Sequence, residues 1–211
     1  MDTEEVREGY DVVAQAYHER FRDELDSKPF DQTWLNEFGK MLVPGARVVE
    51  VGCGDGHVAD YLFRQGIRIE GLDLASEMVA VAQTAYPHLN FECGDILRLP
   101  YEDNSFDAIV SFYSIVNLDS DDCRTAFLEI KRVLRARGLV TIAFHVGDER
   151  LRMENWWDTD ANLDFFLHPI KRISEQLVQA KQSILEIKTR APYSADVESQ
   201  TTRAYVLVQS G

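Results

Sequence analysis

Apolar residues follow two alternating patterns along the chain, and these patterns predict alternating strands and helices. Short apolar runs typical of buried strands lie at residues 48–51, 67–72, 90–93, 106–110, 138–144, 184–187 and 204–208. Most of the intervening segments carry the 3.6-residue period of a helix, at residues 57–65, 76–85 and 122–134 and more weakly at 170–180. This alternation favours an α/β fold, in which helices cover both faces of a mostly parallel sheet.

The two ends of the chain depart from this alternation. Helical patterns at residues 10–24 and about 30–41 predict two cap helices before the first strand. Residues 188–203 lack helical periodicity, so we expect the last strand to be antiparallel to its neighbour. The prediction is a doubly wound, mostly parallel seven-stranded sheet in a single domain. The predicted domain spans residues 1–211. It consists of a helical cap at residues 1–44 and a core at residues 45–211, and residues 145–170 of the core form a substrate-side loop.

Composition and charge narrow the class of protein. A chain of 211 residues with 45% hydrophobic content suits one globular domain. No apolar run approaches the roughly 20 residues of a membrane-spanning helix, and the N-terminal residues are charged, so we expect a cytoplasmic protein without membrane partners. A net charge of −14 without a basic cluster argues against nucleic-acid binding. Whether the protein is a monomer or a homodimer stays open.

The cysteines and histidines do not indicate a metal site. Cys53, Cys93 and Cys123 lie far apart and form no C-x-x-C pair, which argues against a zinc site or a disulfide framework. The histidines have no metal-ligand spacing among themselves. We therefore expect no metal.

A glycine-rich loop follows the first predicted strand. Residues 48–56 read V-V-E-V-G-C-G-D-G, and Gly52, Gly54 and Gly56 leave the carboxyl end of the strand, where doubly wound sheets bind ligands. Glycine has no Cβ, so a ligand can approach the backbone, and the next helix presents unpaired N–H groups there. The dinucleotide fingerprint G-x-G-x-x-G needs a glycine at the position of His57, so the spacing disfavours a nicotinamide site.

The spacing E-x-G-x-G-x-G resembles motif I of the class I S-adenosylmethionine-dependent methyltransferases. Two further matches follow the next strands, Asp73 in E-G-L-D-L-A-S-E-M and Asp95 in E-C-G-D-I. The resemblance implies that Asp73 accepts hydrogen bonds from the ribose hydroxyls and that Asp95 faces the adenine. It covers about residues 10–145 well and the tail loosely.

The resemblance also implies a set of residues that bind S-adenosylmethionine and its product S-adenosylhomocysteine. Tyr10 and Tyr17 resemble the Y-D-x-x-A-x-x-Y element that closes over the cofactor in many members acting on small molecules. Both tyrosines also fit an amphipathic core helix, and this alternative stays open. The expected cofactor-binding residues are Tyr10, Tyr17, Glu50, Gly52, Cys53, Gly54, Gly56, Asp73, Leu74, Met78, Gly94, Asp95, Ile96, Ser111 and Phe112.

The acceptor side is less well defined. Many members carry histidine where Asn117 stands, which leaves the acceptor chemistry open. We expect His145, at the end of the fifth strand, to act as a general base, because its ordinary pKa lies near neutrality. A structural role is the alternative for this histidine, and covering a core edge is the alternative for the paired tryptophans. The expected acceptor-binding residues are Tyr113, Asn117, Glu149, Trp156 and Trp157.

These features predict a methyltransferase that acts on a small-molecule acceptor. The segment F-H-V-G-D-E-R-L-R-M-E-N-W-W resembles a little-characterised bacterial subgroup of the family, which fixes no substrate. The sulfonium of the cofactor carries an activated methyl group, so the enzyme mainly aligns an in-line transfer to O, N or C. Two alternatives remain: an adenosyl-nucleotide-binding module that regulates or scaffolds a partner without catalysis, and, less favoured, an NAD-dependent oxidoreductase.

Overall fold

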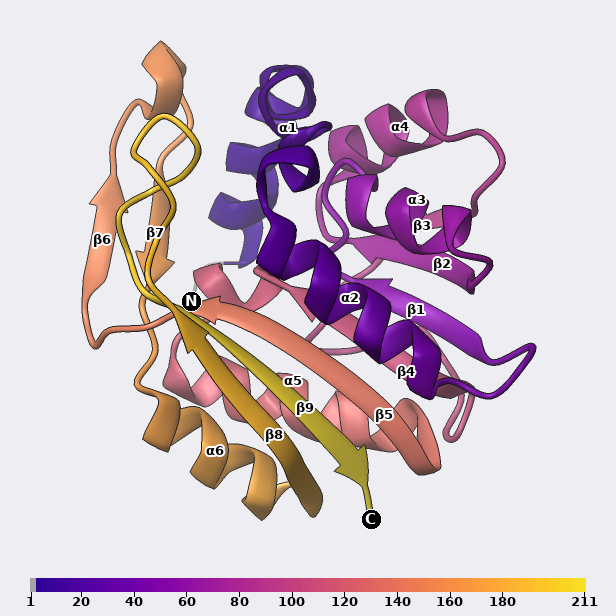
Figure 1. Ribbon diagram of the computed structural model, residues 1–211. Coiled ribbons are helices and arrows are strands. Elements are labelled where there is room, and N and C mark those ends of the chain that lie inside the picture. The colour runs from indigo at the N-terminus through magenta and orange to yellow at the C-terminus, as the bar shows by residue number, and fades with distance from the viewer. Residues whose placement is uncertain (1–2) are drawn as a thin grey trace.

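Seven strands form one sheet in the order β3-β2-β1-β4-β5-β9-β8 (Figure 1). The computed structural model describes residues 3–211. The strands are β1 (Arg47–Val51), β2 (Arg68–Asp73), β3 (Phe91–Cys93), β4 (Phe106–Phe112), β5 (Leu134–His145), β8 (Gln182–Arg190) and β9 (Arg203–Ser210). Neighbours from β3 to β5 are parallel, whereas β9 is antiparallel to both β5 and β8. The predicted doubly wound sheet with an antiparallel last strand is confirmed.

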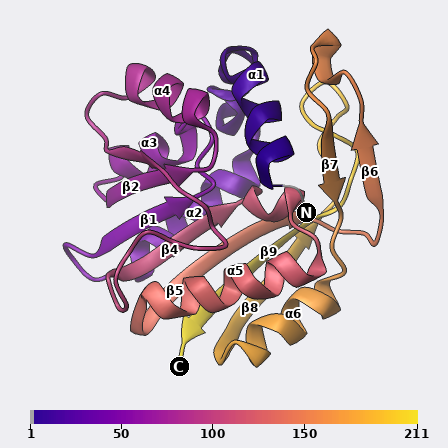
Figure 2. The same cartoon turned by 180° about the vertical axis from the view of Figure 1, so that it is seen from behind.

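Helices cover both faces of this sheet. They are α1 (Thr3–Phe21), α2 (Pro29–Met41), α3 (His57–Arg64), α4 (Ser76–Ala85), α5 (Ser120–Val133) and α6 (Ile170–Gln179), with short 3-10 turns η1 (Glu24–Ser27), η2 (Ser114–Asn117) and η3 (Trp156–Asp158). Side chains of α2, α3 and α4 share one hydrophobic core with the front of the sheet. Those of α5 and α6 share another with the back of the sheet. Figure 2 shows these two helices lying over that face. Both faces are therefore buried, as the continuous apolar runs predict.

The first helix begins earlier than predicted, at Thr3 instead of residue 10, and it ends at Phe21. Its buried stripe extends back to Val6 and Gly9. A Cβ on Gly9 would lie 2.7 Å from the Leu163 side chain, so this glycine allows close packing and does not end the helix. Helix α1 lies above the carboxyl ends of the strands, beside α4 (Figure 1).

Part of the predicted substrate-side loop forms a hairpin that the sequence did not predict. Strands β6 (Arg150–Met153) and β7 (Leu163–Phe166) pair in antiparallel fashion and form a separate two-stranded sheet. We call residues 150–166 the arm. Each strand has only four residues, and two of the four residues in the β6 pattern R-L-R-M are charged. This segment therefore lacks the apolar run used to identify strands. The arm packs beside α1 (Figures 1 and 2).

Among residues 3–211, no helix combines the length and apolar character needed to cross a membrane.

Candidate cofactor and acceptor site

A cavity of about 120 Å³ lies between the carboxyl ends of the central strands and α1. Most of the expected cofactor-binding residues line it, and so do the expected acceptor residues Tyr113 and Asn117. Gly56 and Ser111 lie outside this wall, since Gly56 packs against Phe91 and the Ser111 hydroxyl bonds that of Ser114 at 2.6 Å. The expected cofactor residues in the wall are Tyr10, Tyr17, Glu50, Gly52, Cys53, Gly54, Asp73, Leu74, Met78, Gly94, Asp95, Ile96 and Phe112.

Glycine is needed at the three positions of this loop for different structural reasons. All three have positive φ, +69° at Gly52, +55° at Gly54 and +84° at Gly56. A Cβ at Gly52 would overlap Ser114, and one at Gly56 would lie 2.6 Å from the Phe91 ring. A Cβ at Gly54 would meet only Tyr17, at 3.8 Å. Gly52 and Gly56 are therefore required by packing, whereas Gly54 leaves backbone open to a ligand.

Asp73 joins the end of β2 to this loop. Its Oδ2 accepts a hydrogen bond from the Gly54 N–H at 2.7 Å, and its Oδ1 accepts one from the Ala75 N–H at 3.0 Å. Burial raises the pKa of Asp73, although these backbone N–H groups oppose the shift. Each carboxylate oxygen keeps a lone pair for a further donor, so Asp73 retains the capacity to bind a ligand hydroxyl.

Glu50 lies beneath the same cavity with an unsatisfied oxygen. The residue is 2% exposed, and its Oε2 has no hydrogen-bond partner within the described part of the chain. Burial raises the pKa of Glu50 to about 8, and nearby Asp55 and Asp73 add to the rise while His57 opposes it. A buried acceptor without a partner is costly, so this oxygen is suited to receive a donor group from a ligand.

Two tyrosines of α1 cover the cavity. The Tyr10 hydroxyl donates to Asn117 Oδ1 at 2.9 Å, and Asn117 Nδ2 donates to the Asp164 carbonyl at 2.8 Å. Asn117 therefore fastens both α1 and β7 to the loop after β4. Burial is the main cause that raises the pKa of both Tyr10 and Tyr17, so both phenols stay protonated.

The paired tryptophans lie behind these tyrosines and not in the cavity wall. Trp156 and Trp157 stack at the tip of the arm, with ring centroids 4.1 Å apart. Trp156 lies 5.9 Å from Tyr10, and Trp157 lies 6.2 Å from Tyr17. Glu149 lies on the exposed stretch before the arm, where it accepts a hydrogen bond from the Asp148 N–H. The tryptophans thus support α1 from outside.

His145 is not part of the cavity wall either. Its Nδ1 lies 2.6 Å from the Thr201 hydroxyl, which itself accepts a hydrogen bond from Arg203. One ring nitrogen of His145 is therefore engaged with a side chain outside the cavity wall. Burial, followed by the positive charges of Arg203 and Lys28, lowers the pKa of His145 to about 3. The imidazole is neutral and packs 5.2 Å from the Tyr113 ring.

Sequence reasoning missed two ionisable residues of the wall, Glu24 and His57. The His57 imidazole lies between Asp55 Oδ1, at 2.6 Å, and Glu24 Oε1, at 3.2 Å. Burial opposes its charged form, but the two carboxylates raise the pKa of His57 well above its ordinary value. Burial likewise opposes ionisation of Glu24, yet His57 and Lys28 lower its pKa to about 2. A polar residue directly after the glycine loop was a signal for His57, whereas nothing local marks Glu24.

Parts of the chain match known methyltransferases in sequence. The family described as "Methyltransferase domain" matches residues 49–142. A demethylmenaquinone methyltransferase of Beutenbergia cavernae is 30% identical over 146 residues, 67% of this chain and 58% of that protein. The O-methyltransferase rstn1 of Aspergillus nomiae is 34% identical over 116 residues, 51% of each chain. The chain thus spans about half the length of the curated relatives it matches.

Solved structures resemble the whole sheet at low sequence identity. A methyltransferase of Methanosarcina mazei, described as S-adenosylmethionine-dependent, has a TM-score of 0.73 and 17% identity, covering 82% of this chain and 96% of that one. The [4+2]-cyclase SpnF has a TM-score of 0.67 and 20% identity, covering 85% and 80%. At these identities the likeness shows the fold alone, and the second example shows that one fold hosts different chemistry.

Proposed function

Since the chain belongs to the class I S-adenosylmethionine-dependent methyltransferase family, we propose that it transfers a methyl group from S-adenosylmethionine to a small-molecule acceptor. The observation that carries the proposal is the open backbone at Gly54, held by the Asp73 carboxylate at the end of β2. The same proposal treats the chain as one cytoplasmic domain without nucleic-acid or membrane partners, which the net charge of −14 supports for nucleic acid.

The residues present fit this cofactor. Asp73 has free lone pairs for hydroxyl groups, the orphaned Glu50 oxygen suits an ammonium group, and the apolar Met78 and Ile96 suit an aromatic base. Bound there, the cofactor would supply a methyl group already activated on a sulfonium. The chain would bind and orient it, while Tyr10 and Tyr17 exclude water from above.

We propose that Tyr113 and Asn117 contact the acceptor from the loop after β4. In this proposal Trp156 and Trp157 keep the α1 tyrosines in place, and His145 supports Tyr113 from outside the wall. The acceptor atom, O, N or C, stays open. A second candidate, adenosyl-nucleotide binding without catalysis, is favoured by one observation: the carboxylate of Glu24 is already paired with His57 and Lys28, which makes it a weak base.

The test is calorimetry with S-adenosylhomocysteine on Asp73→Ala. We expect the variant to lose at least about 30-fold in affinity, or about 2 kcal/mol, because a charged hydrogen-bonding group is removed. Asp107→Ala is the matched control. It removes a carboxylate that binds the Arg47 N–H and Arg135 at the opposite end of the sheet, so affinity should stay within about twofold.

Wild-type protein that binds NADH and ignores S-adenosylhomocysteine at millimolar concentration would contradict the proposal. Incubation with labelled S-adenosylmethionine and a panel of metabolites then separates the two candidates. Saturable methylated product supports the enzyme, whereas tight binding without turnover supports the binding module.

A further inference from the structure

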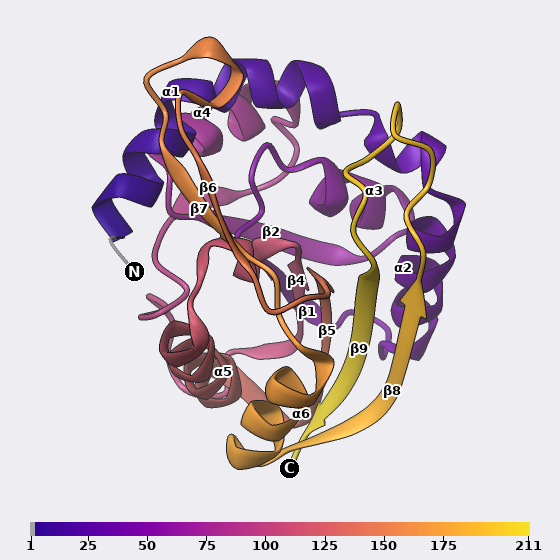
Figure 3. The ribbon, with the colours of Figure 1, turned by 90° about the vertical axis from the view of Figure 1, so that its left-hand side faces the viewer.

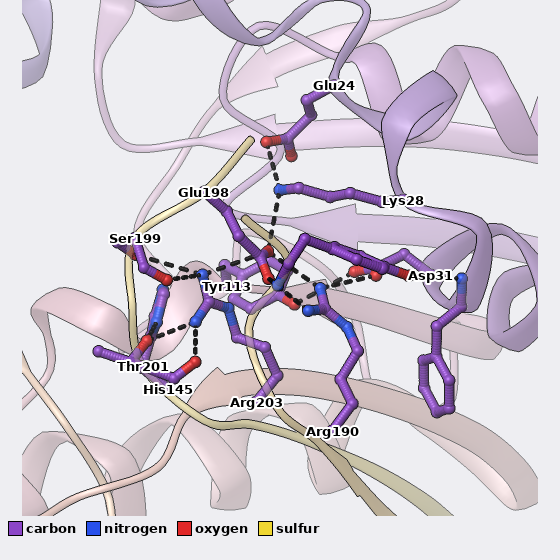
Figure 4. A network of polar contacts seen from close by, with 12 residues as sticks. Glu24, Lys28, Asp31, Tyr113, His145, Arg190, Glu198, Ser199, Thr201 and Arg203 are labelled. Atoms are coloured by element: carbon purple, nitrogen blue, oxygen red, sulfur yellow. Dashed lines mark hydrogen bonds and ion pairs between the residues drawn. The ribbon is translucent and has the colours of Figure 1, made fainter. Parts of the chain in front are cut away.

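A network of buried charges lies beside the cavity, between the start of α2 and the loop that joins β8 to β9 (Figure 4). Its members, which we call the charge network, are Lys28, Asp31, Arg190, Glu198 and Arg203. None of these side chains is more than 8% exposed. Figure 3 shows the loop after β8 extending past the end of the sheet toward α2. The charge network thus joins two segments that are far apart in the sequence.

Arg190 is the centre of the charge network. It donates to Asp31 Oδ2 at 2.9 Å and to both carboxylate oxygens of Glu198. Glu198 also lies 3.3 Å from Arg203 and 3.8 Å from Lys28. The charge network has three positive and two negative side chains. Glu24, which pairs with Lys28 at 2.6 Å, supplies a third negative charge. The charges are therefore balanced, and the network has no charge left over to recruit a ligand of its own.

The charge network reaches the cavity wall at Tyr113. The Tyr113 hydroxyl lies 3.1 Å from Asp31 Oδ1 and 2.9 Å from the Tyr205 hydroxyl, and the Tyr205 hydroxyl lies 2.9 Å from the same Asp31 oxygen. Two phenols therefore share one buried carboxylate oxygen. Tyr113 lines the cavity, whereas Tyr205 does not.

The backbone at Tyr113 explains why this anchor matters. Tyr113 has φ +58° and ψ +18°, a left-handed conformation that is unfavourable for a bulky residue. Its neighbours Phe112 and Ser114 line the cavity too. β4 ends at Phe112, and the backbone of the turn that follows is bonded to β5 at one point, where the Tyr113 N–H donates to the Ala143 carbonyl at 2.9 Å. The Tyr113 hydroxyl adds a second attachment, to Asp31, that holds the far end of the same residue.

We infer that Asp31 is a positioning residue for the proposed methyl-transfer site, because it anchors the Tyr113 hydroxyl and so fixes the cavity-lining turn 112–114. Asp31 is 0% exposed and lies outside the cavity, on a cap helix that carries no part of the glycine loop. The inference rests on the proposed function, because it concerns the same cavity. In this role, Asp31 lets α2 and the β8–β9 loop influence ligand binding although neither contacts the ligand.

The test compares Tyr113→Phe with Tyr205→Phe by calorimetry with S-adenosylhomocysteine. Each variant removes one hydroxyl from Asp31. Tyr205→Phe also leaves the Arg190 Nε–H without its acceptor, so it should lose at least as much thermal stability as Tyr113→Phe. Tyr113→Phe should nevertheless lower the affinity about 10-fold, because the turn 112–114 loses its attachment to Asp31, while Tyr205→Phe should change it less than twofold. Far-UV circular dichroism confirms that both are folded at the temperature of titration.

Substitution of Asp31 supplies a second readout. Asp31→Asn keeps an oxygen for the Tyr113 hydroxyl and should stay within about threefold of wild-type affinity, whereas Asp31→Leu should match Tyr113→Phe. If either variant fails to fold, the tyrosine pair decides alone. Equal affinities for the two tyrosine variants would overturn the inference. Wild-type protein that does not bind S-adenosylhomocysteine would instead overturn the proposed function.

Discussion

On the glycine-loop side of the cavity, the groups that face the ligand come from strand ends and from backbone within a few residues of them. Gly54 and Asp73 are joined by a single backbone-to-carboxylate hydrogen bond across two neighbouring parallel strands. On the cap side, Tyr113 depends on Asp31, 82 residues away, and Asp31 depends on Arg190, 159 residues away. The first side, formed by the glycine loop and Asp73, is built by local backbone geometry, and we call it the backbone wall. The second, formed by Tyr113 and the charge network behind it, is built by long-range pairing of buried charges, and we call it the cap wall.

The two walls should therefore be sensitive to different kinds of substitution. The backbone wall depends on steric space, so a single added methyl group should disturb it. The cap wall depends on charge balance, so loss of one partner leaves the others buried and unpaired.

The largest effect is expected from Arg190→Met, which breaks the cap wall. The variant leaves Asp31 and Glu198 without their common cation, and we expect a loss of about 3 to 5 kcal/mol in the free energy of unfolding, measured by urea denaturation. Lys188→Met on the same strand is the control. Its exposed pair with Glu186 should contribute less than about 1 kcal/mol. Equal losses in the two variants would show that the charge network does not hold the cap wall.

A smaller and opposite pair of effects is expected from two glycines of the loop after β1, of which Gly54 lies in the cavity wall and Gly56 lies outside it. Gly56→Ala should cost roughly 3 kcal/mol of stability, because its methyl group overlaps the Phe91 ring at a positive φ. Gly54→Ala should cost only about 1 kcal/mol, since its methyl group meets only the Tyr17 ring at an ordinary contact distance of 3.8 Å, but should lower S-adenosylhomocysteine affinity at least about 10-fold. Thermal denaturation and calorimetry on both variants measure the contrast. If Gly54→Ala binds like wild type, the open backbone is not the ligand site.

The last prediction tests the backbone wall through its dependence on pH and concerns Glu50. The folded protein keeps the Glu50 proton up to about pH 8, whereas the unfolded chain releases it near the ordinary value of 4.5. The folded state therefore binds more protons within this window, and stability should fall as pH rises through it. Glu50→Gln should remove this dependence, so that its free energy of unfolding stays level between pH 5 and pH 8 where that of the wild type falls, measured by urea denaturation at several pH values. An unchanged pH profile would show that Glu50 is ionised in the fold.

The sequence predicted the backbone wall better than the cap wall for a physical reason. The glycine loop, Asp73 and Asp95 follow consecutive strands, and parallel strands bring their carboxyl ends to one edge, so pattern alone brings these residues together. Glu24 and Asp31 acquire a role only through partners contributed by distant segments, which no local period reveals. The expected base His145 ends a strand as predicted, but Thr201, 56 residues later, occupies its nitrogen. The arm was missed because each of its strands has only four residues and two of the four in β6 are arginines.

Asn117 hydrogen-bonds α1 on one side and β7 on the other, and its amide carries no proton that titrates in the range of cellular pH. A histidine at that position would change charge near neutrality and with it the strength of both bonds. We therefore expect the attachment of α1 over the cavity to be insensitive to acidity near neutral pH, which a histidine in place of Asn117 would not allow.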